Sequence, residues 1–172
     1  MRRRLFWLLA AAAILLAAQP APAQRAVFVV RHAEKASDSN DPGVPLSQKG
    51  RVRAKKLAAV LVKTGVTAIY STDTVRTLDT AKPLAQVLKI TVQKYEATDA
   101  QGRPDLLPLA EVLKTEHARD VVLVVGHSNT VPPLLKALGY AEPVEIPADR
   151  FGDLFVLVPA GTGPPTLLRL SY

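Results

Sequence analysis

Short apolar runs alternate along the chain with longer stretches in which apolar residues recur every three or four positions. Short runs rich in Val, Ile and Phe predict buried strands, and the longer stretches predict helices with one apolar face. Strands are expected over 27–30, 66–70, 90–95 and 121–125. A first helix should begin after an N-cap at Ser47 and end at Gly65, and further helices are expected over 75–88, 106–116 and 131–138. Two further strands, 154–158 and 166–170, are joined by a segment rich in Pro and Gly and predict an antiparallel hairpin.

The order of these elements predicts an α/β fold. Strand and helix alternate four times before the final strand pair, and such alternation gives a mostly parallel sheet with helices on both faces. Residues 121–125 are Val-Val-Leu-Val-Val, apolar on both faces, so this strand should be central. We therefore expect a three-layer α/β/α sandwich with a mostly parallel central sheet and an antiparallel C-terminal strand pair.

Residues 1–23 have the pattern of a secretory signal peptide rather than of a folded domain. Three Arg precede an apolar run over 5–18, and Ala21-Pro22-Ala23 supplies the small residues before a cleavage site. The run is shorter than the roughly 20 residues that span a bilayer, which disfavours the alternative of an uncleaved anchor. Cleavage after Ala23 would leave one domain over 24–172, periplasmic or secreted, with no stable membrane insertion.

Composition narrows the partners of this domain. Removing residues 1–23, which hold three Arg and no acidic residue, lowers the formal net charge from +7 to +4, and only 5% of the chain is aromatic. Nucleic-acid binding is poorly supported on both counts, because it relies on strong basic patches and on aromatic side chains that stack on bases. The modest positive charge fits a small phosphorylated or otherwise anionic substrate better. The chain has no Cys, so packing rather than disulfides must hold the domain together.

Unusual polar residues follow three of the four predicted parallel strands. Arg31 and His32 follow the first, Ser71 to Arg76 the second, and Gly126-His127-Ser128 the fourth. Because the carboxyl ends of parallel strands lie on one edge of the sheet, where ligands bind, we expect these side chains to converge. Arg76 also falls in the first turn of a predicted helix, where a positive charge is unfavourable unless an anion lies near it.

Two arginines and two histidines in one pocket suit phosphoryl transfer. Arg31 and Arg76 can each bind phosphate through parallel hydrogen bonds. A neutral imidazole can attack phosphorus to form a phosphohistidine, and the second imidazole, protonated, can stabilise the charge of the transition state. The cations supply the positive charge, so we expect no metal and no other cofactor, and two isolated His are too few ligands for a metal site.

Four motifs occur in order over residues 27–138. They are Arg31-His32-Ala33-Glu34, Leu46-Ser47-x-x-Gly50, Tyr70-Ser71-Thr72-Asp73-Thr74-Val75-Arg76-Thr77 before Thr80-Ala81, and Val125-Gly126-His127-Ser128. Each is weak alone, but together they closely resemble the histidine phosphatase superfamily, also called phosphoglycerate mutase-like. The resemblance implies a three-layer α/β fold and a hydrolase of phosphomonoesters or phosphoramidates, like the histidine acid phosphatases. It also implies His32 as the nucleophile, with Arg31, Arg76, His127 and Ser128 around the phosphate.

The chain departs from the family pattern at two points. Ala33 stands where the family often has Gly, as it does in small members. The region that usually supplies the general acid is short here, which leaves Glu34, Glu96, Asp99 and Asp105 as candidates. The short region also disfavours a mutase with a closing lid and favours an open site, in which an easily departing leaving group has less need of an acid.

Three other functions compete with this interpretation. Residues 126–130, Gly-His-Ser-Asn-Thr, approach the Gly-x-Ser-x-Gly elbow of serine hydrolases, but Thr130 replaces the last Gly and no later His completes a triad. A non-catalytic exported protein that binds an anion or phosphate would have the same pocket. A phosphoglycerate mutase-type phosphotransferase is the third alternative.

Other polar residues are expected to have structural or specificity roles. His117 lies at the end of a predicted helix, where an imidazole meets the helix dipole favourably, so we expect it to be structural. The Lys and Arg residues of the helix after Ser47 should form a solvated face. The choice of substrate would depend on the loops 36–45, 96–104 and 141–152.

Overall fold

The computed structural model describes residues 26–160 and 163–172, and the predicted signal peptide, residues 1–23, lies outside the described residues. The strands are β1 (Ala26–Arg31), β2 (Val66–Ser71), β3 (Val92–Lys94), β4 (Val121–Gly126), β5 (Asp153–Val158) and β6 (Thr166–Ser171). The helices are α2 (Gln48–Leu61), α3 (Val75–Leu88), α4 (Leu107–Thr115) and α5 (Val131–Ala137). No helix in these ranges is long and apolar enough to cross a membrane.

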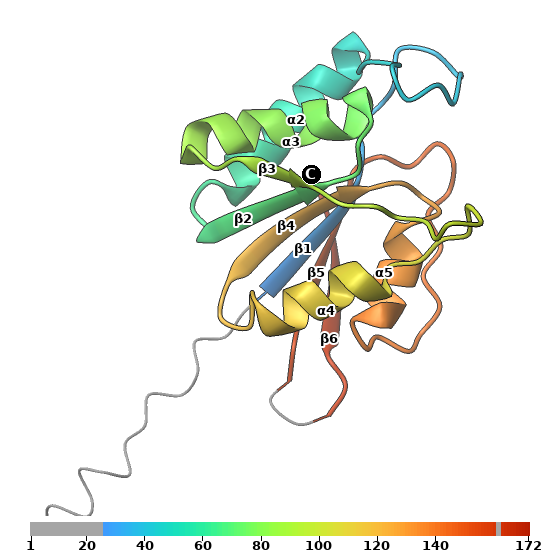
Figure 1. Cartoon of the computed structure of the whole chain (residues 1–172). Helices are drawn as coiled ribbons and strands as arrows, with labels where there is room; N and C mark the ends of the chain where they lie inside the picture. The colour runs from blue at the N-terminus through green and yellow to red at the C-terminus, as the bar shows by residue number, and fades with distance from the viewer. Residues whose placement is uncertain (1–25, 161–162) are drawn as a thin grey trace, which may run out of the picture.

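The six strands form one sheet in the order β3-β2-β4-β1-β5-β6 (Figure 1). β4 pairs in parallel with β1 on one side and with β2 on the other, and β2 pairs in parallel with β3. β5 pairs antiparallel with both β1 and β6. The predictions of a central β4, a mostly parallel sheet and an antiparallel C-terminal pair are therefore confirmed.

Helices cover both faces of the sheet, as predicted. Alternate strand residues face opposite layers: Val27 and Val29 pack with α4 and α5, whereas Phe28 and Val30 pack with α2 and α3. Each central strand divides its side chains in the same way, because successive residues of a strand point to opposite faces. Two hydrophobic clusters result, one on each side of the sheet, and they fix the carboxyl ends of β1, β2 and β4 next to one another.

The start of α2 explains the Leu-Ser-x-x-Gly motif. The Ser47 side chain accepts a hydrogen bond from the backbone N–H of Gly50 at 3.0 Å, which is the predicted N-cap. The backbone N–H of Ser47 also donates to the carbonyl of Glu34, at 2.9 Å. A Cβ on Gly50 would collide with that same carbonyl, so only Gly allows the helix to approach the segment after β1 this closely.

The third strand is shorter than predicted. The sequence predicts a strand over 90–95, and β3 spans only Val92–Lys94. Lys89 caps α3 in the left-handed conformation, with φ of 57°, and the N–H of Ile90 donates to the carbonyl of Ala85. Residues 89 and 90 therefore complete the helix end rather than pair with β2.

Candidate active site

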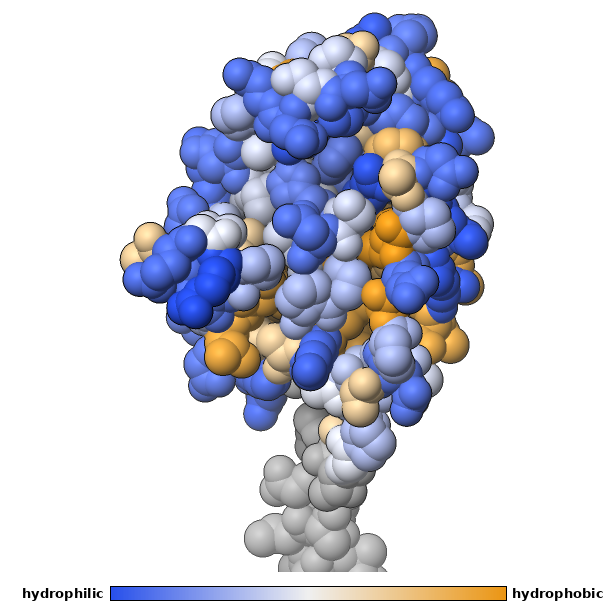
Figure 2. Space-filling model, turned by 90° about the vertical axis from the view of Figure 1, so that its right-hand side faces the viewer, coloured by the Kyte–Doolittle hydropathy of each residue, from blue (hydrophilic) through white to orange (hydrophobic). Residues whose placement is uncertain are grey.

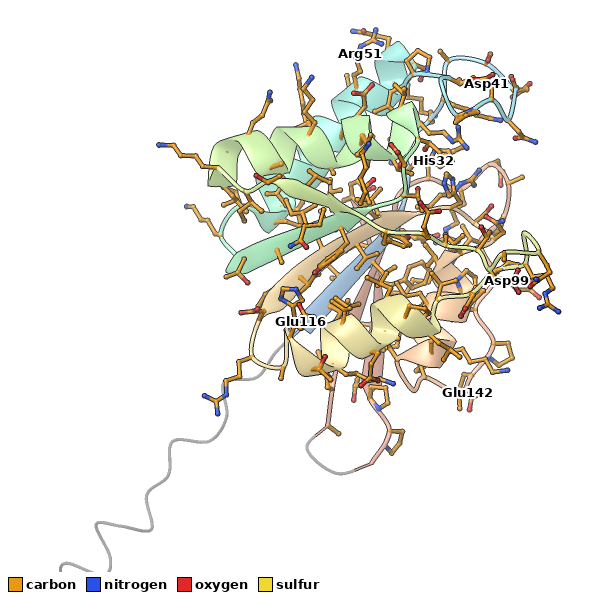
Figure 3. All side chains as sticks on the ribbon, viewed as in Figure 1. His32, Asp41, Arg51, Asp99, Glu116 and Glu142 are labelled. Atoms are coloured by element: carbon orange, nitrogen blue, oxygen red, sulfur yellow. The ribbon has the colours of Figure 1, made fainter. Side chains whose placement is uncertain are left out.

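A pocket of about 390 Å³ opens at the carboxyl ends of β1, β2 and β4. Every residue that lines it has a polar side chain: Arg31, His32, Lys35, Asn40, Arg76, His127, Ser128 and Asn129. The sequence-predicted residues Arg31, His32, Arg76, His127 and Ser128 thus converge, although they come from three separate segments. Figure 3 shows His32 at this edge of the sheet, below the loop that carries Asp41. Figure 2 shows the side of the molecule that lies on the right in Figure 1, and the upper half of this face is largely hydrophilic.

The His32 ring is fixed in one tautomer by its neighbour. Its Nδ1 lies 2.7 Å from the carbonyl oxygen of Ala33. A carbonyl can only accept a hydrogen bond, so Nδ1 carries the proton and Nε2 of the neutral ring keeps its lone pair. Burial lowers the pKa of His32 to about 4; the hydrogen bond with the Ala33 carbonyl opposes this, and Arg31, Arg76 and Lys35 lower the pKa further by smaller amounts. The ring is therefore neutral at physiological pH, in the form that a nucleophile requires.

His127 lies directly beside His32. The two ring centroids are 5.2 Å apart and the planes meet at 65°. The Nε2 of His127 is 2.9 Å from Oγ1 of Thr72, a hydrogen bond that holds the second ring in place. Burial, together with His32 and the two arginines, lowers the pKa of His127 to about 3. Without an anion in the pocket, the His127 ring is neutral, whereas a protonated ring is expected from the sequence. A bound anion would have to raise the pKa of His127 for the protonated form to be present.

Arg31 is anchored by backbone carbonyls of the loop that precedes β5. Its Nη1 donates to the carbonyls of residues 147, 148 and 150 at 3.0, 2.9 and 3.2 Å. The guanidinium carbon lies 4.1 Å from the centre of the Phe151 ring, a cation–π contact. Its Nε is buried and makes no hydrogen bond with the described residues. Arg31 is thus held rigidly while part of its hydrogen-bonding capacity remains unused.

Arg76 is anchored by the other loop beside the pocket. Its Nη1 donates to the carbonyl of Asp41 at 3.0 Å. The Thr80 hydroxyl donates a hydrogen bond to the Arg76 carbonyl. The same hydroxyl oxygen accepts a hydrogen bond from the backbone N–H of Ala33, at 3.0 Å. The first turn of α3 is therefore tied to the residue that follows His32. This contact gives a structural reason for Thr80-Ala81 to accompany the other motifs.

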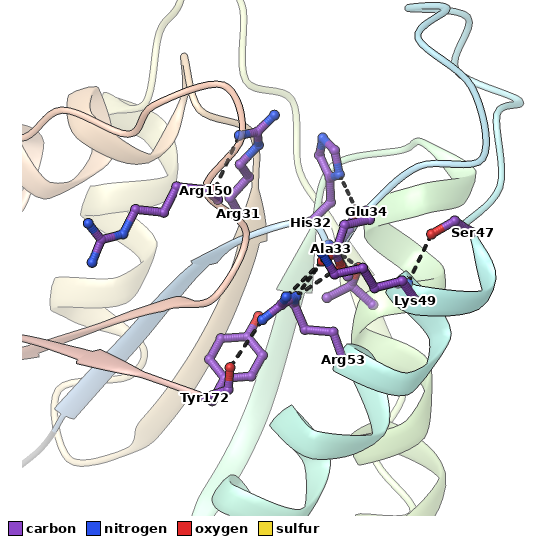
Figure 4. Close-up of polar contacts among 11 residues, drawn as sticks. Arg31, His32, Ala33, Glu34, Ser47, Lys49, Arg53, Arg150 and Tyr172 are labelled. Carbon is purple, nitrogen blue, oxygen red and sulfur yellow. Dashed lines mark hydrogen bonds and ion pairs between the residues drawn. The ribbon is translucent and has the colours of Figure 1, made fainter.

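The predicted general acids are not in the pocket. Both oxygens of Glu34 accept from Arg53, at 2.7–3.0 Å, and the side chain turns away from His32 (Figure 4). Asp99 bonds Arg103 within its own exposed loop, and Asp105 accepts from the backbone N–H at the start of α4. Glu96 and Asp105 line a different pocket, against α4. None of the four lines the pocket of His32, and among the described residues no carboxylate does.

Sequence reasoning missed several residues around the site. Phe151 lies under Arg31, and Lys35 and Asn40 line the pocket. Thr72 belongs to a predicted motif, but its hydrogen bond to His127 was not foreseen. Lys35 follows His32 by only three residues, so proximity in sequence was a usable signal. Phe151 had no such signal, because it reaches Arg31 from a loop more than 100 residues away.

Two side expectations have clear outcomes. His117 is structural, as predicted: Tyr70 bonds its Nε2 at 2.8 Å and Asp120 bonds its Nδ1 at 2.7 Å. The expectation of a solvated basic face on α2 is wrong for Arg53, which is half-buried in its ion pair with Glu34. As for metals, no group of three or more His, Cys, Asp or Glu side chains among residues 26–160 and 163–172 is arranged to hold an ion.

The segment that builds most of this site matches a known family. Residues 27–99, which contain Arg31, His32 and Arg76, match the model of the histidine phosphatase superfamily, branch 1. The resemblance found in the four sequence motifs is thereby confirmed over the first three of them.

The chain is also similar to several named phosphatases, in sequence or in fold. An 8-oxo-(d)GTP phosphatase of Mycolicibacterium smegmatis is 35% identical over 98 residues, which are 50% of this chain and 30% of that protein's length. The solved structure of the protein histidine phosphatase SixA with tungstate has a TM-score of 0.68 at 19% identity, over 85% of this chain and 96% of that one. Mycobacterial glucosyl-3-phosphoglycerate phosphatase with inorganic phosphate has a TM-score of 0.63 at 19% identity, over 86% and 96%. The fold of these phosphatases thus spans most of the chain, including His127.

Proposed function

We propose that this chain is an exported phosphatase that hydrolyses phosphomonoesters or phosphoramidates through a phosphohistidine on His32. The observation that carries the proposal is the arrangement of His32, with Nδ1–H bonded to the Ala33 carbonyl and Nε2 left as a lone-pair donor in a pocket that also holds Arg31, Arg76 and His127. The match to the family model over residues 27–99 supports the same chemistry.

The reaction would proceed in two steps. In the first, Nε2 of His32 attacks phosphorus, and the bond from phosphorus to the leaving oxygen or nitrogen breaks, its electron pair remaining with the leaving group. Arg31 and Arg76 bind the phosphoryl oxygens through both steps. In the second, water attacks the phosphohistidine, loses a proton to solvent and releases phosphate, which restores the lone pair on His32. A dianionic phosphoryl group beside His127 would favour its protonated form, which then adds a further positive charge.

The absence of a carboxylate from the described pocket lining bears on the choice of leaving group. A poor leaving group such as an alkoxide requires a proton as it departs, and a positioned acid typically contributes 10²–10⁴-fold to the rate. Leaving groups that need no acid from the enzyme fit this pocket better. These are the weakly basic anions released from phosphoanhydrides and aryl phosphates, and the nitrogen of a phosphoramidate that has already taken a proton from solvent. The similarity to an 8-oxo-(d)GTP phosphatase and to a protein histidine phosphatase supports the same choice.

Hydrolysis of p-nitrophenyl phosphate, with rapid quench of ³²P-labelled substrate, tests the proposal. Wild-type protein should release p-nitrophenol and form a labelled enzyme species that is stable to base and labile to acid, as a phosphohistidine is. His32→Ala should abolish both signals, about 10³-fold or more in kcat, while it still binds vanadate. Wild-type protein that binds phosphate but turns over no phosphoester would instead be an anion-binding protein. Transfer of label to an alcohol in preference to water would indicate a phosphotransferase.

Export is a separate part of the proposal and needs its own measurement. It rests on the charged, apolar and small-residue segments of residues 1–23. Mass spectrometry of the protein recovered outside the cytoplasm should find an N-terminus at Gln24. A protein that keeps residues 1–23 and sediments with membranes would indicate the uncleaved anchor instead.

A further inference from the structure

Lys35 is a cation of the pocket that the phosphate site described above does not use. Its Nζ donates to the carbonyls of Asp38 and Ser39 at 2.8 and 2.9 Å and lies 3.4 Å from Oδ1 of Asn40. All three acceptors are uncharged oxygens of the loop that follows β1. The contacts therefore hold the ammonium group in position without neutralising its charge.

The pocket carries more positive charge than one phosphoryl group balances. Arg31, Arg76 and Lys35 all line it, and no carboxylate does. In the described part of the chain, none of the three has a carboxylate oxygen within 4.0 Å. Asp149 and Glu34 attract Arg31, and Asp41 attracts Arg76, only from beyond that distance. A phosphoryl group carries about −1.5 to −2 charges at pH 7, which two arginines already balance. The third charge is thus left for another anionic group.

The space and the neighbouring side chains suit such a group. The pocket volume of about 390 Å³ lies within the range of about 300–1,000 Å³ that holds a whole small molecule, so a group beyond the phosphate has room. Asn40 and Asn129 line the same pocket, and the NH₂ of an amide side chain donates hydrogen bonds to carboxylate or phosphate oxygens.

We propose that Lys35, with Asn40 and Asn129, forms a second anion subsite, and that the substrate carries a carboxylate or a second phosphate besides the phosphoryl group that is transferred. The inference rests on the proposed function in one respect, since it assigns Arg31 and Arg76 to the transferred group. It goes further by restricting the substrate to molecules with two anionic groups.

Binding of paired phosphonates tests the subsite without requiring turnover. The probes are phosphonoacetate and phosphonoacetamide, which differ by one carboxylate, with 3-phosphonopropionate and its amide for a longer reach and methylenediphosphonate for a second phosphate. Isothermal titration at constant ionic strength should show at least one acid bound about tenfold more tightly than its amide. If methylenediphosphonate binds tightly while both carboxylates bind only as well as their amides, the second anionic group of the substrate is a phosphate.

Variants of the subsite residues separate it from general attraction to a positive pocket. In Lys35→Gln the preference for the acid over the amide should fall below twofold, while the affinity for the amide probe stays nearly unchanged. Lys35→Arg should keep most of the preference for the acid. Lys56→Gln, which removes an exposed positive charge on α2, is the matched control and should keep all of it. Asn129→Asp places a negative charge at the subsite without touching the Lys35 loop and should reverse the preference, which provides the test if Lys35→Gln does not fold.

Two results would overturn the subsite. In the first, wild-type protein binds each carboxylate probe no more tightly than its amide, and binds methylenediphosphonate no more tightly than a phosphonate with a single anionic group. The other is an equal loss of acid and amide in Lys35→Gln, which would assign Lys35 to the transferred phosphate or to loop structure. A protein that shows the predicted preference but turns over no phosphomonoester or phosphoramidate, whether it carries one anionic group or two, would refute the proposed function and leave the subsite standing.

Discussion

The ion pair between Glu34 and Arg53 offers a test that separates structure from catalysis. Arg53 donates to both carboxylate oxygens through Nε and Nη2, and its Nη1 donates to the backbone carbonyl of Tyr172 at 3.1 Å. The side chains of Glu34 and Arg53 are only 12% and 20% exposed. Replacing Arg53 by Met would keep the length of the side chain and remove these hydrogen bonds.

The expected cost lies between those of surface and buried pairs. Exposed pairs contribute about 0.2–1 kcal/mol, and breaking a fully buried pair costs about 3–5 kcal/mol. Given the bidentate geometry and partial exposure, Arg53→Met should lower the free energy of unfolding by about 2 kcal/mol. For a domain of this size that corresponds to a decrease in Tm of about 4–8 °C. Urea denaturation followed by circular dichroism measures it directly.

The loss should also depend on pH. Burial alone would raise the pKa of Glu34, but the hydrogen bonds from Arg53, with Lys49 nearby, outweigh burial and hold this pKa below its ordinary value. A carboxyl whose pKa is lowered in the folded state contributes stability above its unfolded pKa, and this stability is lost as the pH falls through the folded pKa. The difference between wild type and Arg53→Met should therefore be full at pH 7 and should shrink below about pH 4.

A double-mutant cycle with Glu34→Gln completes the test. If the pair acts as a unit, Glu34→Gln and Arg53→Met should be clearly non-additive, with a coupling above about 1 kcal/mol. Additive effects on the free energy of unfolding would refute the reasoning from geometry. Glu34→Gln should also leave kcat for p-nitrophenyl phosphate within about twofold, whereas a fall of 10²-fold or more would restore Glu34 as the general acid.

Three further outcomes follow from other contacts. Gly50→Ala should destabilise the protein by about 1–3 kcal/mol in thermal denaturation, although Ala is the better helix former, because its Cβ would collide with the Glu34 carbonyl; an unchanged Tm would contradict this. The ¹⁵N chemical shifts of the imidazole rings should show that His32 and His127 are still neutral at pH 5.5, because burial lowers their pKa values to about 4 and about 3. Titration of either ring near pH 6.5 would count against the pocket geometry. Thr72→Val should lower kcat/KM about tenfold with less than about 1.5 kcal/mol lost in stability, through release of the His127 ring; unchanged kinetics would show that this hydrogen bond has no part in positioning.

Much of the fold was predictable because local pattern and global architecture agree. Residues 121–125 are apolar on both faces, and β4 indeed lies between two parallel strands. The order of strands was not predictable from periodicity, which does not show that β5 pairs with β1 rather than only with β6. The end of α3 was predicted correctly at residue 88, but the start of β3 was placed two residues too early. Residues 89 and 90 complete the helix end, and the left-handed cap there is formed by Lys89, whereas glycine is the residue that normally signals such a cap.

The centre of the site was predictable for a different reason. Arg31, His32 and His127 immediately follow strands, and parallel strands bring their carboxyl ends to one edge whatever else the chain does. The general-acid candidates lie outside the pocket lining, and for Glu34 the reason is that nearness in sequence says little about the direction of a side chain. Glu34 is two residues from His32, yet its side chain turns toward Arg53 on α2. Only the packing of α2 against the segment after β1 determines that direction.

The way in which the arginines are held explains how one pocket can attract an anion and keep its nucleophile reactive. Arg31 and Arg76 are anchored by backbone carbonyls, which fix a guanidinium without cancelling its charge as a carboxylate partner would. Burial is the main reason that the pKa of His32 falls to about 4, and the two arginines add to it, so the same charges that favour phosphate also keep Nε2 unprotonated. The anchoring carbonyls belong to the two loops beside the pocket, 36–45 and 141–152. Exchanging either loop with that of a histidine phosphatase of known structure should therefore alter the binding of the transferred phosphate as well as the choice of substrate, because the loop that selects the substrate also positions the arginine that binds the phosphate.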